Sequence, residues 1–191
     1  MTRYIRRLLL PWLAVTMVAC GPRAVEHVDP ETGLSSWKAE HRGLSIELVQ
    51  VLPDYVRAVY ASKRLPREVV EKVASQCVFG TILRNLSQEP LTYDVGRWRY
   101  ITPDGREHRI RTKSEWVREW QDMGIAFRWS LLPEKVTFGV GDWDQGFMTL
   151  ALPPGAEFDL EYSWTVGGAT HRARLEGLRC APAAPPVKPE E

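Results

Sequence analysis

The chain has 191 residues, of which 44% are hydrophobic and 26% are charged, and its formal net charge is +1. This length fits one domain with tails, and the composition excludes both an intrinsically disordered protein and a membrane protein with many spans. A net charge this close to zero gives no electrostatic sign of nucleic-acid binding, so no nucleic-acid partner is expected.

The N-terminus has the pattern of a signal peptide. Three arginines within the first seven residues precede an apolar run over residues 8–18, which Pro11 interrupts. A transmembrane helix needs roughly 18 or more apolar residues, so this run is too short to span a bilayer. The sequence therefore predicts a signal peptide over residues 1–19.

The end of this segment, Met17-Val18-Ala19-Cys20, resembles the lipobox of bacterial lipoproteins. The resemblance implies a diacylglyceryl thioether on Cys20, cleavage after Ala19, and a membrane anchor made of acyl chains such as palmitate. Gly21 stands where an Asp would favour retention in the inner membrane, which implies a periplasm-facing lipoprotein of the outer membrane. An ordinary secretory signal with an incidental cysteine is the alternative.

Cleavage would change both the charge and the cysteine count. It removes three of the 25 Lys and Arg residues and no acid, which leaves 22 basic and 24 acidic residues and a net charge near −2. With Cys20 lipidated, Cys77 and Cys180 remain. An even number of cysteines in an oxidising compartment favours a disulfide between them, and two separately buried thiols are the alternative.

The mature chain divides into three parts. Residues 20–40 contain two prolines and scattered charges without periodicity, which predicts a lipidated Cys followed by a flexible tether. Residues 181–191 contain four Pro and three Ala, which predicts a disordered tail. Residues 41–180 are expected to form the folded domain.

Strands dominate this domain. Glu157–Val166 alternates apolar and polar residues without a break, and Gly167-Gly168 predicts a hairpin turn into a strand over residues 169–180. The other predicted strands cover residues 44–51, 55–61, 77–86, 91–101, 106–112, 125–132, 135–141 and 147–152.

Two short helices interrupt the strands, at residues 66–75 and 112–124. In the second, Thr112 and Glu115 match a capping box, and Trp116 and Trp120 share one face. Short strands joined by regular turns predict a mainly β fold, namely a β-sandwich, most simply immunoglobulin-like, with two helical insertions. A small barrel is the alternative.

Two segments are candidate binding surfaces. One is a basic and aromatic stretch that could bind an anionic surface, although its arginines could also form an ordinary solvated strand face and its tryptophans part of the core. The other is a loop with alternating aspartates that faintly resembles the start of a calcium loop, although a simple turn is the alternative. The candidate residues are Arg97, Arg99, Arg109, Arg111, Trp116 and Trp120 in the stretch, and Asp142, Trp143 and Asp144 in the loop.

No motif in the sequence specifies a reaction, a metal or a cofactor. The loop has Gly146 where a calcium loop needs a third oxygen ligand, and the four histidines lack metal-site spacing. The sequence therefore favours a non-catalytic lipid-anchored module that binds or scaffolds an envelope protein or an anionic envelope component. A substrate- or metal-handling accessory protein and an enzyme with an unrecognised acidic pair are the alternatives.

Overall fold

The computed structural model describes residues 23–128 and 130–186, which form two antiparallel β-sheets and three short α-helices. The prediction of a mainly β chain is confirmed. The signal peptide, the lipobox with Cys20, and residues 187–191 of the tail lie outside the described residues.

The first sheet has the strand order β1-β2-β3-β4-β9. Its strands are β1 (Val25–Val28), β2 (Ser35–His41), β3 (Leu44–Val51), β4 (Cys77–Asn85) and β9 (Trp143–Leu150). The bounds of β3 agree with the predicted strand.

The second sheet is built around the long strand β10 (Glu157–Val166), whose bounds also agree with the prediction. One side of β10 pairs with β11 (Ala169–Arg179) along its length. The other side pairs first with β6 (Arg99–Ile101) and then with β5 (Leu91–Asp94). The outermost strands are β7 (Glu107–Arg109) beside β6 and β8 (Lys135–Phe138) beside β5.

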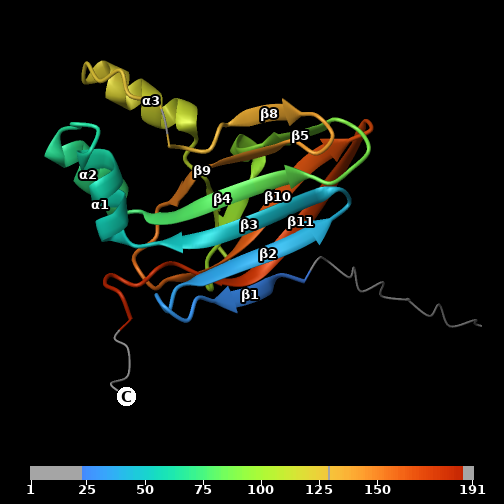
Figure 1. Cartoon of the computed structure of the whole chain (residues 1–191), viewed down its shortest axis with the longest axis horizontal. Helices are drawn as coiled ribbons and strands as arrows, with labels where there is room; N and C mark the ends of the chain where they lie inside the picture. The colour runs from blue at the N-terminus through green and yellow to red at the C-terminus, as the bar shows by residue number, and fades with distance from the viewer. Residues whose placement is uncertain (1–22, 129, 187–191) are drawn as a thin grey trace, which may run out of the picture.

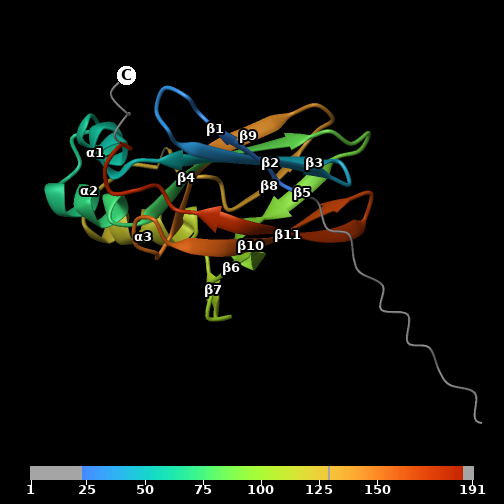
Figure 2. The same cartoon turned by 90° about the horizontal axis from the view of Figure 1, so that it is seen from below.

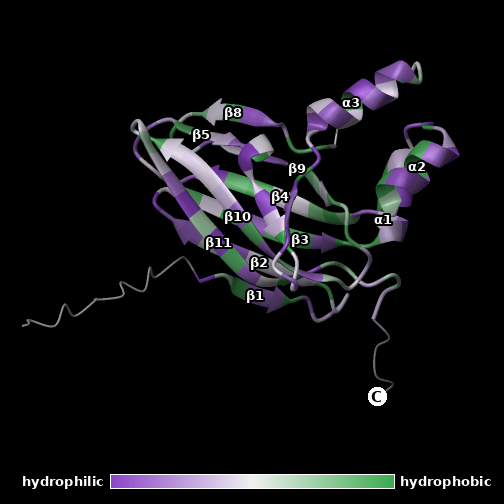
Figure 3. Cartoon of the chain, turned by 180° about the vertical axis from the view of Figure 1, so that it is seen from behind, coloured by the Kyte–Doolittle hydropathy of each residue, from purple (hydrophilic) through white to green (hydrophobic). Residues whose placement is uncertain are grey.

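The two sheets lie one over the other and share a hydrophobic core (Figure 2). The alternation that predicted β10 produces this core, because Phe158, Leu160, Tyr162 and Trp164 are all buried while the residues between them are more exposed. The same alternation of hydrophilic and hydrophobic residues is visible along β11 in Figure 3. The polar residues of β10 and β11 therefore lie on the outer face of the second sheet.

The helices α1 (Pro53–Ala61), α2 (Arg67–Ala74) and α3 (Lys113–Asp122) lie at one end of the sheets (Figure 1). They enclose a second core that includes Tyr60, Trp116 and Trp120. The capping box of α3 is confirmed, since the Thr112 side chain accepts from the Glu115 backbone N–H and the Glu115 side chain accepts from that of Thr112.

The segment before β8 closes this end of the molecule against β9. The backbone N–H of Leu132 donates to the carbonyl of Phe147 at 3.0 Å. A Cβ atom on Gly146 would lie 2.3 Å from the backbone nitrogen of Leu132. Position 146 must therefore be glycine for this backbone approach to occur.

The prediction of a flexible tether over residues 20–40 is wrong for the described part. Residues 25–28 and 35–41 form β1 and β2, and Trp37 is 3% exposed and packs on Phe79. The side chains of β1 are all exposed, and β2 buries the small Ser35 and Ala39 beside Trp37. Small buried residues and exposed ones do not produce an alternation of apolar and polar side chains, so the sequence of these two strands has no strand pattern.

Two predicted strands are also wrong. Residues 55–61 lie in α1, since Val56 and Tyr60 are four positions apart and both are buried, and Pro53 occupies the first turn. Residues 125–128 and 130–132 contain no strand apart from an isolated bridge between Leu131 and Phe147. Ile125, Phe127 and Leu131 pack in the core beneath the helices, and Leu132 packs in the core between the sheets.

The predicted strand over residues 91–101 is interrupted. A 3-10 turn, η1 (Val95–Arg97), separates β5 from β6, and the Asp94 side chain accepts a hydrogen bond from the Gly96 backbone N–H at its start. This break lets one side of β10 pair with two different strands.

The disulfide between Cys77 and Cys180 is confirmed, and it joins β4 to the chain just after β11. The start of the predicted disordered tail is packed, because Ala181 is 5% exposed and its carbonyl accepts from the Gly155 N–H at 3.0 Å. The Gln50 side chain strengthens this junction by donating to the carbonyls of Arg179 and Cys180.

Candidate functional site

Trp116 and Trp120, two of the candidate surface residues, are buried and cannot form a binding surface. They are 1% and 0% exposed, and their rings lie 5.9 Å apart inside the helical core. The Trp116 indole N–H donates to the Thr149 hydroxyl at 2.9 Å. Their spacing in the sequence therefore marks the packed face of α3.

Arg109 and Arg111 are held by acidic residues of α3. Arg109 binds Glu115 at 2.6 Å, and Arg111 binds Glu119 while its guanidinium lies 3.7 Å above the Trp116 ring. Hydrogen bonds, first from Lys72 and then from Arg111, hold the pKa of Glu119 below its usual value. These two arginines therefore attach α3 to the segment before it, and their charges are neutralised by acids of the same protein.

Of the second candidate segment, only Asp142 lies in a turn, because Trp143 and Asp144 are the first residues of strand β9. Asp142 accepts from the Gly139 backbone N–H at 2.9 Å, and Asp144 accepts from the Tyr93 hydroxyl at 2.8 Å. Burial, followed by the hydrogen bond to Asp144, raises the pKa of the Tyr93 hydroxyl. Among the described residues, no three side chains of metal-binding type come together. Trp143 is 53% exposed and has Arg84 over its ring.

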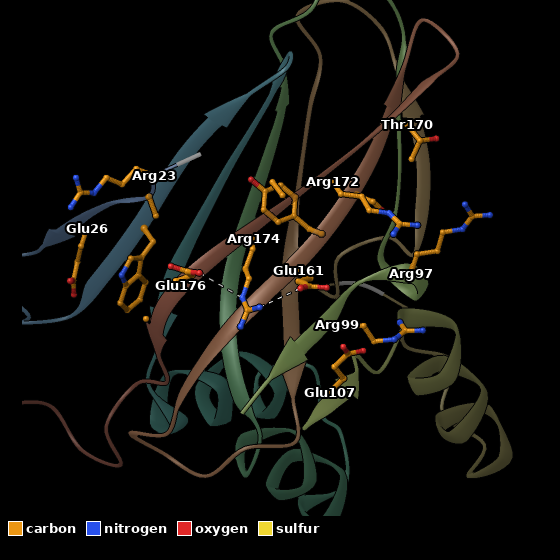
Figure 4. Close-up of a pocket in the computed structure, with 16 residues that line it drawn as sticks. Arg23, Glu26, Arg97, Arg99, Glu107, Glu161, Thr170, Arg172, Arg174 and Glu176 are labelled. Atoms are coloured by element: carbon orange, nitrogen blue, oxygen red, sulfur yellow. Dashed lines mark ion pairs between the residues drawn. The ribbon is translucent and has the colours of Figure 1, made fainter. Parts of the chain in front are cut away.

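The remaining candidates, Arg97 and Arg99, lie in a groove on the outer face of the second sheet. The groove has a volume of about 1120 Å³ and crosses β6, β10 and β11 to reach Arg23 ahead of β1. The structure adds two arginines from β11, Arg172 and Arg174. Figure 4 shows Arg97, Arg99 and Arg172 on one side of this groove, and we call these three residues the arginine cluster.

Register explains why residues so far apart in the sequence meet here. Ser163 of β10 lies opposite Arg172 of β11, and the η1 turn with Arg97 lies on the other side of Ser163. The Trp98 indole N–H fixes this turn by donating to the Ser163 carbonyl at 3.0 Å. A small side chain thus lies between two long arginines, which leaves space above it.

The charges in the groove are separated. Arg174 is surrounded by acids, with its guanidinium 2.7 Å from Asp159, 3.5 Å from Glu161 and 4.0 Å from Glu176. Within the arginine cluster, Arg97 is the one member that forms an ion pair with a described residue, namely Asp94 at 3.5 Å.

The other two members of the cluster have uncompensated charges. Arg99 donates to the backbone carbonyls of Gly96 and Trp98, which orients it without neutralising it. The Arg172 side chain is exposed and forms no ion pair or hydrogen bond with the described residues. The arrangement can hold an oxyanion, because guanidinium groups match the geometry of carboxylate and phosphate oxygens.

Sequence reasoning missed Arg172 and Arg174. Their signal was the pattern His171-Arg172-Ala173-Arg174, in which the arginines occupy the polar positions of β11. That pattern predicts their face, but the register that brings Arg172 beside Arg97 depends on pairing between distant segments.

No known protein family matches the sequence, and no curated protein is a relative by sequence. One solved structure shows a partial likeness, a candidate lipoprotein from Bacillus subtilis. It has a TM-score of 0.37 and 8% sequence identity, and the alignment covers 80% of this chain and 38% of that one. The chain thus spans about two fifths of that protein, and a likeness this weak supports no argument.

None of the helices in the described part of the chain is long and apolar enough to cross a membrane.

Proposed function

We propose that this protein is a lipid-anchored, non-catalytic module of the periplasm-facing outer membrane that binds an anionic envelope component through the arginine cluster. The observation that carries the proposal is the charge of the groove. Arg99 and Arg172 have no acidic partner within the described residues, whereas Arg174 in the same groove has three. The exposed Arg172 guanidinium keeps its full capacity for charged hydrogen bonds to a ligand, and Arg99, which donates only to backbone carbonyls, keeps its positive charge.

The lipid anchor is the second part of the proposal. It is supported by the lipobox resemblance of Met17-Val18-Ala19-Cys20. Metabolic labelling with a palmitate analogue should mark the wild type, and Cys20→Ala should lose both the label and the membrane association. A Cys20→Ala protein that stays with the membrane fraction would contradict an anchor made of lipid alone.

We also assign the two-sheet arrangement to the β-sandwich class and propose an immunoglobulin-like relationship. The support is the disulfide between the two sheets, since antibody domains also carry an inter-sheet disulfide, although here the second cysteine follows the last strand, β11.

Binding to purified lipopolysaccharide, used as an anionic envelope probe, tests the arginine cluster. A hydrogen bond to a charged group contributes about 1.5–3 kcal/mol, so Arg97→Gln combined with Arg172→Gln should weaken binding at least tenfold. Arg67→Gln on α2 is the matched control, because Arg67 is also exposed and has no ion pair within the described residues. Binding should also fall between 50 and 300 mM salt, as roughly expected for screened charges. Equal binding by the double variant and the wild type would refute the proposed site.

A further inference from the structure

The folded domain begins very close to the position proposed for the lipid anchor. β1 starts at Val25, and Arg23 and Ala24 already line the groove. Even a fully extended chain covers only about 10 Å between Cys20 and Arg23, at roughly 3.3–3.6 Å per residue. One end of the groove must therefore lie near the lipid headgroups whenever Cys20 carries acyl chains.

β1 is held to the rest of the fold, so this closeness is a property of the whole domain. Its residues pair in register with those of β2, from Val25 opposite Lys38 to Val28 opposite Ser35. Across the gap between the two sheets, Glu26 of β1 binds Arg179 of β11 at 3.6 Å. The groove thus cannot move away from the anchor unless these contacts open.

The chemistry of the groove suits a phosphate group better than an uncharged surface. The cluster offers three guanidiniums around Ser163, whose hydroxyl has no hydrogen bond within the described residues and can donate to an oxyanion. Two acids of the groove, Glu161 and Glu176, are engaged by Arg174, while Glu107 lies beside Arg99 (Figure 4). An anion that enters the groove therefore meets Arg172, whose guanidinium forms no ion pair with the described residues.

We propose that the arginine cluster binds the phosphate groups of anionic phospholipids in the leaflet that holds the Cys20 anchor. This inference rests on the proposed function and names its ligand. Each basic side chain near an anionic surface strengthens association about fivefold. The anchor adds to this by keeping the headgroups at an effective concentration in the millimolar range, as short linkers do. The outer face of the second sheet then lies toward the membrane, and the helical end stays free for other contacts.

Hydrogen exchange of the lipidated full chain in vesicles tests the proposal. One sample uses phosphatidylcholine alone and the other adds about one third phosphatidylglycerol, both at 50 mM salt. We expect backbone amides of η1, β10 and β11 to exchange at least fivefold more slowly on the anionic vesicles. The difference should vanish at 500 mM salt because the Debye length then falls to a few ångströms. Arg97→Gln combined with Arg172→Gln should abolish it, and Arg67→Gln should preserve it.

Each contrary outcome has a distinct meaning. Equal protection on both vesicle types, or none on either, would overturn the headgroup inference. In that case lipopolysaccharide and inorganic phosphate are added to the same protein. Protection by either probe that the double variant loses would retain the proposed function, and no protection by any anion would refute both. Thermal melting of each variant verifies that it is folded.

Discussion

Replacing Trp120 by alanine should destabilise the protein strongly although the residue lies far from the proposed binding site. Trp120 is 0% exposed, and its ring centre lies 6.0 Å from that of Tyr60, 5.9 Å from that of Trp116 and 5.8 Å from that of Phe127. Truncating a buried tryptophan to alanine costs about 3–5 kcal/mol, because it removes apolar contacts and leaves a cavity. Trp120 thus packs against α1, against the preceding turn of α3 and against the segment after α3.

The lower end of that range is expected here. The Trp120 indole N–H is buried and has no hydrogen-bond partner within the described residues. Its removal relieves a desolvation cost, so we expect a net loss of about 3 kcal/mol. For a chain of this size each kcal/mol shifts the melting temperature by about 2–4 °C, which gives a decrease of about 6–12 °C. Trp120→Phe should lose much less, since it keeps a ring and removes only the unpaired N–H together with part of the volume.

Differential scanning fluorimetry or calorimetry measures these shifts, and Trp143→Ala is the matched control. Trp143 is 53% exposed, and its contact with Arg84 over the ring contributes about 0.5–1 kcal/mol. A Trp120→Ala protein that melts within 2 °C of the wild type, or no lower than Trp143→Ala, would show that the helical core is not packed as described.

Three further predictions concern the disulfide, a glycine and a histidine. Replacing Cys77 and Cys180 by alanine should lower the free energy of unfolding by up to about 4.7 kcal/mol, because the bridge closes a loop of 103 residues. Thermal melting with and without reductant measures this loss, and a wild type whose melting temperature does not respond to reductant would contradict it. Gly146→Ala should destabilise the protein, because the new Cβ atom would clash with the backbone of Leu132. Urea unfolding measures this loss, and an unchanged midpoint would contradict the close contact. Burial, followed by the charges of Arg42 and His171, lowers the pKa of His41 in the folded state, so the folded state favours the neutral ring. The stabilisation that comes from the neutral His41 ring is present above pH 6.5 and is lost as the pH falls through the folded pKa. The melting temperature should therefore decrease between pH 7.5 and pH 5.5, and His41→Gln should make this decrease smaller.

The parts of the fold predicted from the sequence are those in which local pattern and burial agree. β10 alternates over its whole length, and α3 has a capping box followed by two tryptophans four positions apart. The Cys77–Cys180 bridge followed from cysteine count and compartment. Each of these features is determined by a few neighbouring residues or by the number of cysteines, so it can be predicted without knowing which distant segments pair.

The missed parts depend on contacts between distant segments. Residues 55–61 have both a two-residue and a four-residue apolar spacing, and only the surface against which they pack selects the helix. The arginine cluster likewise needs the register of β10 with β11 and the break at η1. The sequence suggested Arg97 and Arg99 as part of a basic stretch, but Arg109 and Arg111 of the same stretch turned out to be neutralised by α3.

The length of the link between Cys20 and the folded domain matters most for the proposed function, and it is much shorter than the predicted tether. A flexible link of some twenty residues would let the domain stand up to about 70 Å from the membrane, and any partner at that height could be reached. With β1 beginning at Val25, the link from Cys20 is five residues and spans at most about 17 Å. If Cys20 carries the proposed acyl chains, a charged groove that ends at Arg23 lies within reach of the headgroups at all times, and proximity as well as charge would select its ligand. Inserting a flexible ten-residue Gly/Ser segment after Gly21 separates these two effects, because it lengthens the link and leaves the groove intact. It should weaken the exchange protection on anionic vesicles while leaving lipopolysaccharide binding unchanged, and equal protection with both links would show that proximity plays no part.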